Sequence, residues 1–184
     1  MTTKDLTTLD MEIILMKHFD FVRKIIVPNV TDMSGLVEFE TDLLILSKSN
    51  YATGIEIKIS KSDLLNDLKK RQYGKYFTKD ADNLTQKCKK YYSAFKYFYY
   101  AVPDFLVEEA KKVIHPFCGI LSIEINDYEF FTKSEFKVRE EIKVNEVRKP
   151  KFLNNNRWND KQVNHLLRLG NMRVYALKNR LNLV

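Results

Sequence analysis

The sequence predicts a single α/β domain with a mixed central β-sheet flanked by helices. Short apolar segments of strand character alternate with segments whose apolar residues recur at helical spacing. The chain has 184 residues, of which 45% are hydrophobic, and this is enough to bury a substantial core. Its five glycines and four prolines do not gather into a linker, so we expect residues 1–184 to form one domain.

The first part of the chain predicts one helix and three strands. Apolar residues at helical spacing predict a helix over residues 8–19, with Thr7 or Thr8 as its N-cap. Runs rich in aliphatic and β-branched residues predict strands over residues 24–30, 36–46 and 51–60. The polar segment 47–54 is expected to turn the chain back, so that the second and third strands pair.

A helix is predicted directly after the third strand, over residues 61–71. Ser60 or Ser62 caps it, because a serine hydroxyl can accept a bond from an N–H of the first turn. Its inner stripe is Leu64, Leu65 and Leu68. The basic residues that end it favourably for the helix dipole are Lys69, Lys70 and Arg71.

Residues 72–96 interleave aromatic and basic side chains, among them Lys75, Tyr76, Lys89 and Lys90. Such a segment can hold phosphates and stack unpaired bases, which favours a partly mobile basic insertion. The alternative is that Tyr91, Tyr92 and Phe95, which stand at helical spacing, pack into the core.

The remaining elements continue the alternation. Strands are predicted over residues 97–102 and 118–125, with a helix over residues 103–114 between them. An extended hairpin over residues 128–144 and a connector over residues 148–159 follow. A basic C-terminal helical extension is predicted over residues 158–184, capped by Asn159 or Asp160 and interrupted at Gly170.

An acid and a Glu-x-Lys triplet lie on two neighbouring predicted strands. In the run Ile55-Glu56-Ile57-Lys58-Ile59-Ser60, the two-residue period sends the isoleucines to one face and Glu56 and Lys58 to the other. Asp42, on the preceding strand, can approach Glu56 across the pair. An ordinary surface ion pair and a strand-start aspartate would give the same pattern.

Converging carboxylates and an ammonium suit one kind of chemistry in particular. Phosphodiester hydrolysis needs a deprotonated water and neutralised charge on the phosphate, which Mg²⁺ held by one or two carboxylates can supply. Lys58 would orient or help deprotonate the water, or act as a point charge on the phosphate oxygens.

The chain resembles a known nuclease superfamily over residues 39–124, with one interruption. The resemblance rests on Thr41-Asp42-Leu-Leu-Ile-Leu46, on Ile55-Glu56-Ile57-Lys58 with the run that follows it to Lys70, and on the later segments Tyr97-Phe-Tyr-Tyr-Ala-Val-Pro103 and Phe117-Cys-Gly-Ile-Leu-Ser-Ile-Glu124. These are similar to the PD-(D/E)XK superfamily and, within it, to MmcB-type DNA-repair proteins and their phage relatives. Thr41 stands where the family's first motif has proline. The resemblance implies a restriction-endonuclease-like fold.

The resemblance also implies roles for individual residues. Asp42 and Glu56 would be metal ligands together with the backbone carbonyl of Ile57, and Lys58 would be the catalytic lysine. Many members add an acid from the first helix, for which the candidate here is Glu12. A glutamate on a helix surface is as often an ordinary solvent-exposed residue that binds no metal.

Charge is distributed unevenly along the chain. The formal net charge is +7, made up of −4 over residues 1–57, +7 over 58–96, −4 over 97–129 and +8 over 130–184. Acids therefore gather where a metal would lie and bases gather elsewhere, which suits a polyanion gripped by its backbone. A generally lysine-rich composition, or a basic helix face that contacts only solvent, would give the same charge pattern. The candidate nucleic-acid contacts are Lys61, Lys69, Lys70, Arg71, Lys75, Lys89, Lys90, Arg168 and Arg173.

Several other classes find no motif in the sequence. The two cysteines lack CxxC spacing, the three histidines lack metal-binding spacing, and no glycine-rich phosphate loop occurs. No run of 18 apolar residues and no secretory signal is present, so we expect a cytoplasmic protein without a membrane partner.

The function that follows is metal-dependent DNA cleavage, by an endonuclease or an exonuclease in repair, recombination or phage DNA processing. Mg²⁺ is the expected cofactor, with Mn²⁺ as a substitute because both accept oxygen ligands. The alternatives are a catalytically silent DNA-binding module of the same fold and an RNA nuclease. The oligomeric state is left open, with a dimer as one option.

Overall fold

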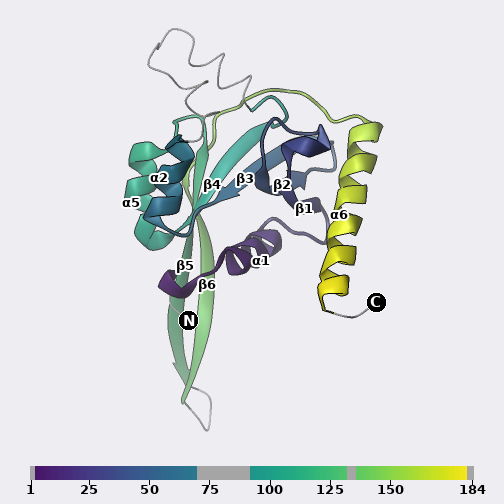
Figure 1. The fold of residues 1–184 in the computed structure, drawn as a ribbon. Coiled ribbons are helices and arrows are strands. Elements are labelled where there is room, and N and C mark those ends of the chain that lie inside the picture. Colours follow the sequence, from purple (N-terminus) through teal and green to yellow (C-terminus); the bar gives the residue numbers. More distant parts are fainter. Residues whose placement is uncertain (1–2, 70–91, 132–135, 182–184) are drawn as a thin grey trace.

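The computed structural model describes residues 3–69, 92–131 and 136–181 (Figure 1). Its strands are β1 (Ile25–Val30), β2 (Thr41–Leu46), β3 (Ala52–Ile57), β4 (Tyr97–Pro103), β5 (Gly119–Phe131) and β6 (Phe136–Arg148). Its α-helices are α1 (Thr8–His18), α2 (Lys61–Lys69), α5 (Val107–Val113) and α6 (Asp160–Arg180). Short 3₁₀ turns are η1 (Thr3–Asp5), η2 (Asp32–Ser34) and η4 (Asp104–Leu106).

The strands form one six-stranded sheet in sequence order. Strands β1, β2 and β3 pair antiparallel, β3, β4 and β5 pair parallel, and β5 and β6 form a long antiparallel hairpin. The α/β class with a mixed sheet flanked by helices, and the C-terminal helix, are therefore confirmed. The hairpin extends well below the rest of the sheet in Figure 1.

Two of the helices begin where the sequence predicts, because their caps are complete. At α1 the Thr7 hydroxyl accepts the Asp10 N–H at 3.2 Å, and the Asp10 carboxylate accepts the Thr7 N–H at 2.9 Å. At α6, Asn159 and Gln162 exchange the same pair of bonds, each at 3.0 Å. Reciprocal capping of this kind satisfies N–H groups that have no partner within the helix.

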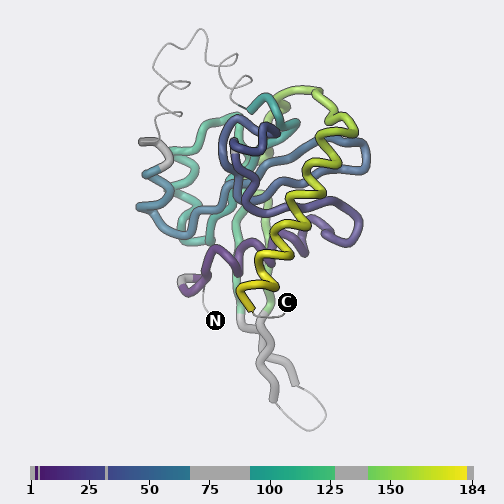
Figure 2. Tube along the Cα trace, turned by 45° about the vertical axis from the view of Figure 1, so that its right-hand side comes forward, coloured from purple at the N-terminus to yellow at the C-terminus, as the bar shows by residue number. Residues whose placement is uncertain are grey.

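Helices cover both faces of the sheet. On one face α1 buries Met11 and Leu15 among Leu43, Ile55 and Ile57. On the other face lie α2, α5 and α6, the first two beside each other and α6 along β1 (Figures 1 and 2). Each contributes a buried residue to the core beneath it, namely Leu64, Ala110 and Leu166.

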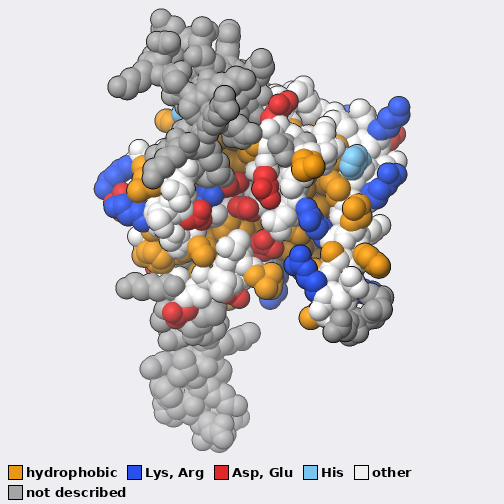
Figure 3. Space-filling model, viewed as in Figure 1, with side chains coloured by type: hydrophobic (Ala, Val, Ile, Leu, Met, Phe, Trp, Pro, Cys, Tyr) orange, Lys and Arg blue, Asp and Glu red, His pale blue; other side chains and the backbone are white. Residues whose placement is uncertain are grey.

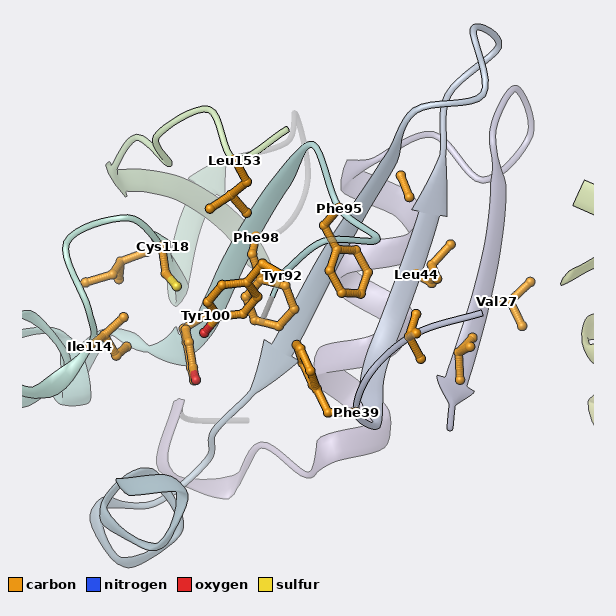
Figure 4. Close-up of a cluster of buried hydrophobic side chains, with 14 of the residues drawn as sticks. Val27, Phe39, Leu44, Tyr92, Phe95, Phe98, Tyr100, Ile114, Cys118 and Leu153 are labelled. Carbon is orange, nitrogen blue, oxygen red and sulfur yellow. The ribbon is translucent and has the colours of Figure 1, made fainter. Parts of the chain in front are cut away.

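Aromatic rings form the centre of this second core (Figure 4). Tyr92 and Phe98 lie 4.6 Å apart between ring centroids, and Phe39 contacts both of them edge-on. Because Tyr92 and Phe95 are fully buried here, the packing alternative holds for these two residues rather than a basic insertion. Residues 72–91 of the predicted insertion, with Lys75, Lys89 and Lys90, lie outside the described residues.

Strand boundaries differ from the prediction where an apolar run is buried without pairing. The predicted strand 36–46 begins only at Thr41, since residues 36–39 form bends whose side chains at Leu36, Val37 and Phe39 fill the core. β3 ends at Ile57, and Gly54 lies inside it rather than in the turn. Burial alone does not distinguish a strand from a buried loop, so an apolar run overestimates strand length.

The C-terminal half shows similar differences. The predicted helix 103–114 is divided into η4 and α5, and the strand predicted over 118–125 continues to Phe131. Gly170 does not interrupt α6, which runs unbroken to Arg180. A Cβ atom at Gly170 would lie 3.5 Å from the Val27 side chain, an ordinary van der Waals contact, so α6 packs on β1 with room for a methyl group.

We predict that Gly54→Ala destabilises the fold by about 1 to 3 kcal/mol, because overpacking strains a dense core. A Cβ at this position would lie 2.6 Å from the Phe98 ring and 2.8 Å from the Phe95 ring. Urea unfolding followed by circular dichroism measures the change. Gly170→Ala is the control, and we expect it to stabilise α6 by about 0.5 to 1 kcal/mol because Ala is the better helix former. An unchanged midpoint for Gly54→Ala would contradict this packing.

Candidate active site

The β2–β3 ladder ends beside two acids. Leu43 pairs with Ile55 and Leu44 with Gly54, so Asp42 and Glu56 are the next residue on each strand beyond the last pair. The Asp42 carboxylate also accepts the Ile57 N–H at 2.6 Å, which ties its side chain to β3.

Lys58 follows β3 directly, and its ammonium lies in the same place. Its Nζ is 2.8 Å from Oε1 of Glu56 and 3.7 Å from Oδ1 of Asp63, at the start of α2. Lys58 and Glu56 are only 4% and 6% exposed. Charged groups are rarely buried to this extent unless they are paired, so the two side chains stabilise each other's ionised form.

The backbone holds this lysine in position. The Lys58 N–H donates to the Ala101 carbonyl of β4 at 3.0 Å, which continues the parallel ladder past the end of β3. The N–H and C=O of one strand residue point to one side, and those of the next residue point to the other side. Since the Lys58 N–H faces β4, the N–H and carbonyl of Ile57 face β2. The predicted carbonyl ligand of Ile57 therefore points toward the side on which Asp42 lies.

Glu12 reaches the same region from α1. Its pKa is raised above the ordinary glutamate value, chiefly by burial and next by the negative charge of Asp42, while a hydrogen bond from the Asn29 side chain acts in the opposite direction. The Glu12 carboxylate is thus close enough to Asp42 to feel its charge. Glu12 of α1 and Asp42 of β2 therefore lie near each other, and Glu56 is on the neighbouring strand β3.

The arrangement is compatible with Mg²⁺, though not as a closed cage of side chains. Within residues 3–69, 92–131 and 136–181, no three His, Cys, Asp or Glu side chains are grouped closely enough to hold a metal on their own. Mg²⁺ is usually held by one or two carboxylates and keeps several waters. Asp42, Glu56 and the Ile57 carbonyl fit that requirement. A cation held there would also offset the negative charge of Asp42, which after burial is the next cause of the raised pKa of Glu12.

Basic side chains flank the acids. In Figure 3 acidic side chains gather near the centre of the face, with Lys and Arg over α2 and α5 on one side and over α6 on the other. Lys61 on α2 is exposed and pairs with Glu109 of α5 at 3.2 Å. Arg168 and Arg173 are exposed on α6. The side chain of Lys69, and Lys70, Arg71, Lys75, Lys89 and Lys90, lie outside the described residues.

Two residues beside the site were not among those predicted from the sequence. Asp63 lies within ion-pair distance of Lys58, and Asn29 acts to lower the pKa of Glu12. Asparagine is depleted in strands, so its place in the run Ile25–Val30 was a signal that the alternation pattern did not use.

Comparison with known proteins adds little. No family model and no curated protein matches the chain. Among solved structures, it is similar to a protein of unknown function from Silicibacter pomeroyi, with 13% identity, a TM-score of 0.48, and 91% of this chain and 86% of that chain covered. Across the part of the chain that the structure describes, no helix combines the length and apolar character needed to cross a membrane.

We predict that Glu12→Gln stabilises the metal-free protein at neutral pH by about 0.5 kcal/mol, a figure that allows for solvent screening. Because the folded-state pKa of Glu12 is raised, folding favours the protonated form, and stability is lost as pH rises from the ordinary glutamate value through the raised one. The glutamine variant lacks this loss, so its advantage should be present at pH 7 and vanish below about pH 4.

Thermal melts in EDTA across this pH range measure the effect. Glu108→Gln is the control, because its pKa is lowered by Lys111 and its loss should give no such gain at neutral pH. Equal pH profiles for wild type and Glu12→Gln would contradict the proximity of Glu12 and Asp42.

Proposed function

We propose that the chain is a Mg²⁺-dependent deoxyribonuclease of the PD-(D/E)XK type, acting as an endonuclease or exonuclease on phosphodiester bonds. The observation that carries the proposal is the buried Lys58–Glu56 pair at the end of β3, together with Asp42 of β2, whose carboxylate accepts the Ile57 N–H between them. An ordinary solvent-exposed strand face does not need a buried ammonium that contacts two acids and lies beside a third acid on the neighbouring strand. Such an arrangement is more typical of a functional site.

The residues divide the chemistry among them. Asp42, Glu56 and the Ile57 carbonyl would hold the metal, with Glu12 as an additional acid. Bound Mg²⁺ would lower the pKa of a water and neutralise charge on the phosphate. Lys58, which is paired with Glu56 and Asp63, would orient the attacking water and stabilise the negative charge that develops on the phosphate oxygens.

The surroundings favour a nucleic-acid substrate. Cations on α2 and α6 stand on both sides of an acidic centre, which would let a phosphate backbone be held at its flanks while one phosphate meets the site. DNA is the substrate we propose, in repair, recombination or phage DNA processing, with RNA as the alternative that uses the same groups. Mn²⁺ would be accepted in place of Mg²⁺.

We predict that Asp42→Asn and Glu56→Gln each lower cleavage by at least about 100-fold, because each removes a charged ligand and with it several kcal/mol of stabilisation. The assay uses labelled single-stranded, duplex and forked DNA, and RNA of the same sequence, with Mg²⁺, Mn²⁺ or EDTA. These substitutions keep side-chain size, and circular dichroism confirms folding. This check is needed because neutralising Glu56 leaves Lys58 with one buried partner fewer.

Glu108→Gln, an exposed acid on α5, is the matched control and should cleave like wild type. Cleavage that persists in EDTA or in both site variants would refute the metal site. Binding without cleavage in any metal would instead support a catalytically silent DNA-binding module.

We predict that Lys61→Gln and Arg168→Gln each weaken DNA binding uniformly across sequences and reduce the slope of log affinity against log salt by about one. Each exposed cation would release about one counterion when it meets a phosphate. Fluorescence anisotropy in EDTA, at several salt concentrations, measures the slope without cleavage. Lys143→Gln is the control, since Lys143 lies on the β5–β6 hairpin and pairs with Glu141 at 3.0 Å. An unchanged slope for both flank variants would place the DNA elsewhere.

A further inference from the structure

The last turns of α6 stand outside the body of the domain. The helix is anchored as far as Arg173, because Leu166 is fully buried in the core and Arg173 donates from its guanidinium to the Asn29 carbonyl of β1 at 2.6 Å. From Val174 to Leu181 every residue is exposed in the part of the chain that the structure describes, at the margin of the molecule (Figure 1). A helical segment of this length is marginal in water unless it packs on something, so it stands to gain from a partner.

Exposed apolar residues form a narrow line along this helix, which we call the α6 stripe. Its members are Leu167, Val174, Leu177 and Leu181, and their side chains are 43% to 67% exposed. With Val163 and Gly170 they stand at positions 163, 167, 170, 174, 177 and 181, so the spacing alternates between four and three residues. This seven-residue repeat is typical of a helix that pairs with another helix. A helix that lies on a membrane has a broader apolar face.

Cations border the α6 stripe on both sides. The flanking positions of the repeat are occupied by Asn171, Arg173, Lys178 and Arg180. Residues 161–184 include five Lys and Arg and no Asp or Glu. A second copy of the chain would therefore place cation against cation at these positions, which disfavours that pairing. The complementary occupant is a helix with acids beside its apolar residues.

Nucleic acid alone does not account for the α6 stripe. A phosphate backbone would use the cations of α6, but it offers no apolar surface to the leucines between them. Contiguous exposed apolar residues with a polar rim are typical of protein docking sites. The spacing of the apolar residues and the sign of the flanking charges therefore indicate the same kind of partner.

We propose that the last turns of α6 are the docking site for an amphipathic helix of a partner protein, with Asp or Glu on both sides of its apolar residues. Val174, Leu177 and Leu181 would be buried between the two helices, at the i, i+3 and i+7 spacing by which paired helices recognise each other. Lys178 and Arg180 would face the acids of the partner. The proposal is independent of the nuclease function, because it uses none of the proposed metal ligands.

The probe is a synthetic peptide of about four heptads, with Leu at the apolar positions and Glu at the flanking positions. Fluorescence anisotropy of the labelled peptide measures its binding to the full chain. We expect an affinity that falls as salt rises, and no binding of the same peptide with Lys in place of Glu. Lys178→Gln combined with Arg180→Gln should weaken binding about 5-fold and reduce its salt dependence, because two exposed ion pairs are lost.

Alanine substitutions test the α6 stripe itself, because alanine preserves the helix. Val174→Ala combined with Leu177→Ala should weaken peptide binding about 10-fold or more, since most of the apolar contact is removed. The matched controls are Met172→Ala and Tyr175→Ala, whose side chains are 59% and 64% exposed but lie outside the repeat. They should bind the peptide like wild type. Circular dichroism confirms that each variant keeps its helix content.

Three results would overturn the proposal. The first is no binding of the Glu peptide, or equal losses in the stripe variants and their controls. The second is dimerisation of wild type in sedimentation equilibrium that Leu177→Ala abolishes, which would make a second copy the occupant. The third is binding to phosphatidylcholine–phosphatidylserine vesicles, but not to the Glu peptide, that depends on the α6 stripe. A protein that binds the Glu peptide through the stripe but cleaves no DNA would uphold this proposal and refute the nuclease.

Discussion

The arrangement depends on one buried ion pair at the end of β3. Removing an ammonium and a carboxylate from water is unfavourable, and their attraction offsets this only when the geometry is good. Here Lys58 and Glu56 are two residues apart on one face of a strand, so the backbone sets their separation before the side chains meet. The surrounding sheet must therefore keep β3 in register, because a slip of one residue would turn both charges into the opposite core.

The aromatic core provides that register. Gly54 leaves room for the rings of Phe95 and Phe98 directly against β3, while Ile55 and Ile57 face α1 on the other side. β3 is thus paired by β2 and β4 and packed on both faces, which is the environment of a rigid element. A site supported in this way loses little conformational entropy when a substrate binds.

Sequence patterns predict the centre of this structure better than its edges. Asp42, Glu56 and Lys58 could be placed because a period of two and a hairpin relate them, and Thr7 and Asn159 because caps are local. The boundary at Thr41 and the continuity of α6 through Gly170 depend on tertiary packing, which local patterns do not contain. The bond from Arg173 to the Asn29 carbonyl could not be predicted, since the two residues are 144 positions apart in the sequence.

The charge pattern would link the proposed metal to binding of the proposed substrate. The chain carries a net charge of +7, yet Asp42, Glu56 and Glu12 bring negative charge to the centre of the face, and Lys58 is already engaged by Glu56. A phosphate would be repelled from that centre and attracted only to the flanks. A divalent cation between the acids would reverse the sign of the local field. Under the proposed function the flanks alone would suffice for loose binding of nucleic acid, whereas close approach of a single phosphate to Lys58 would require the metal.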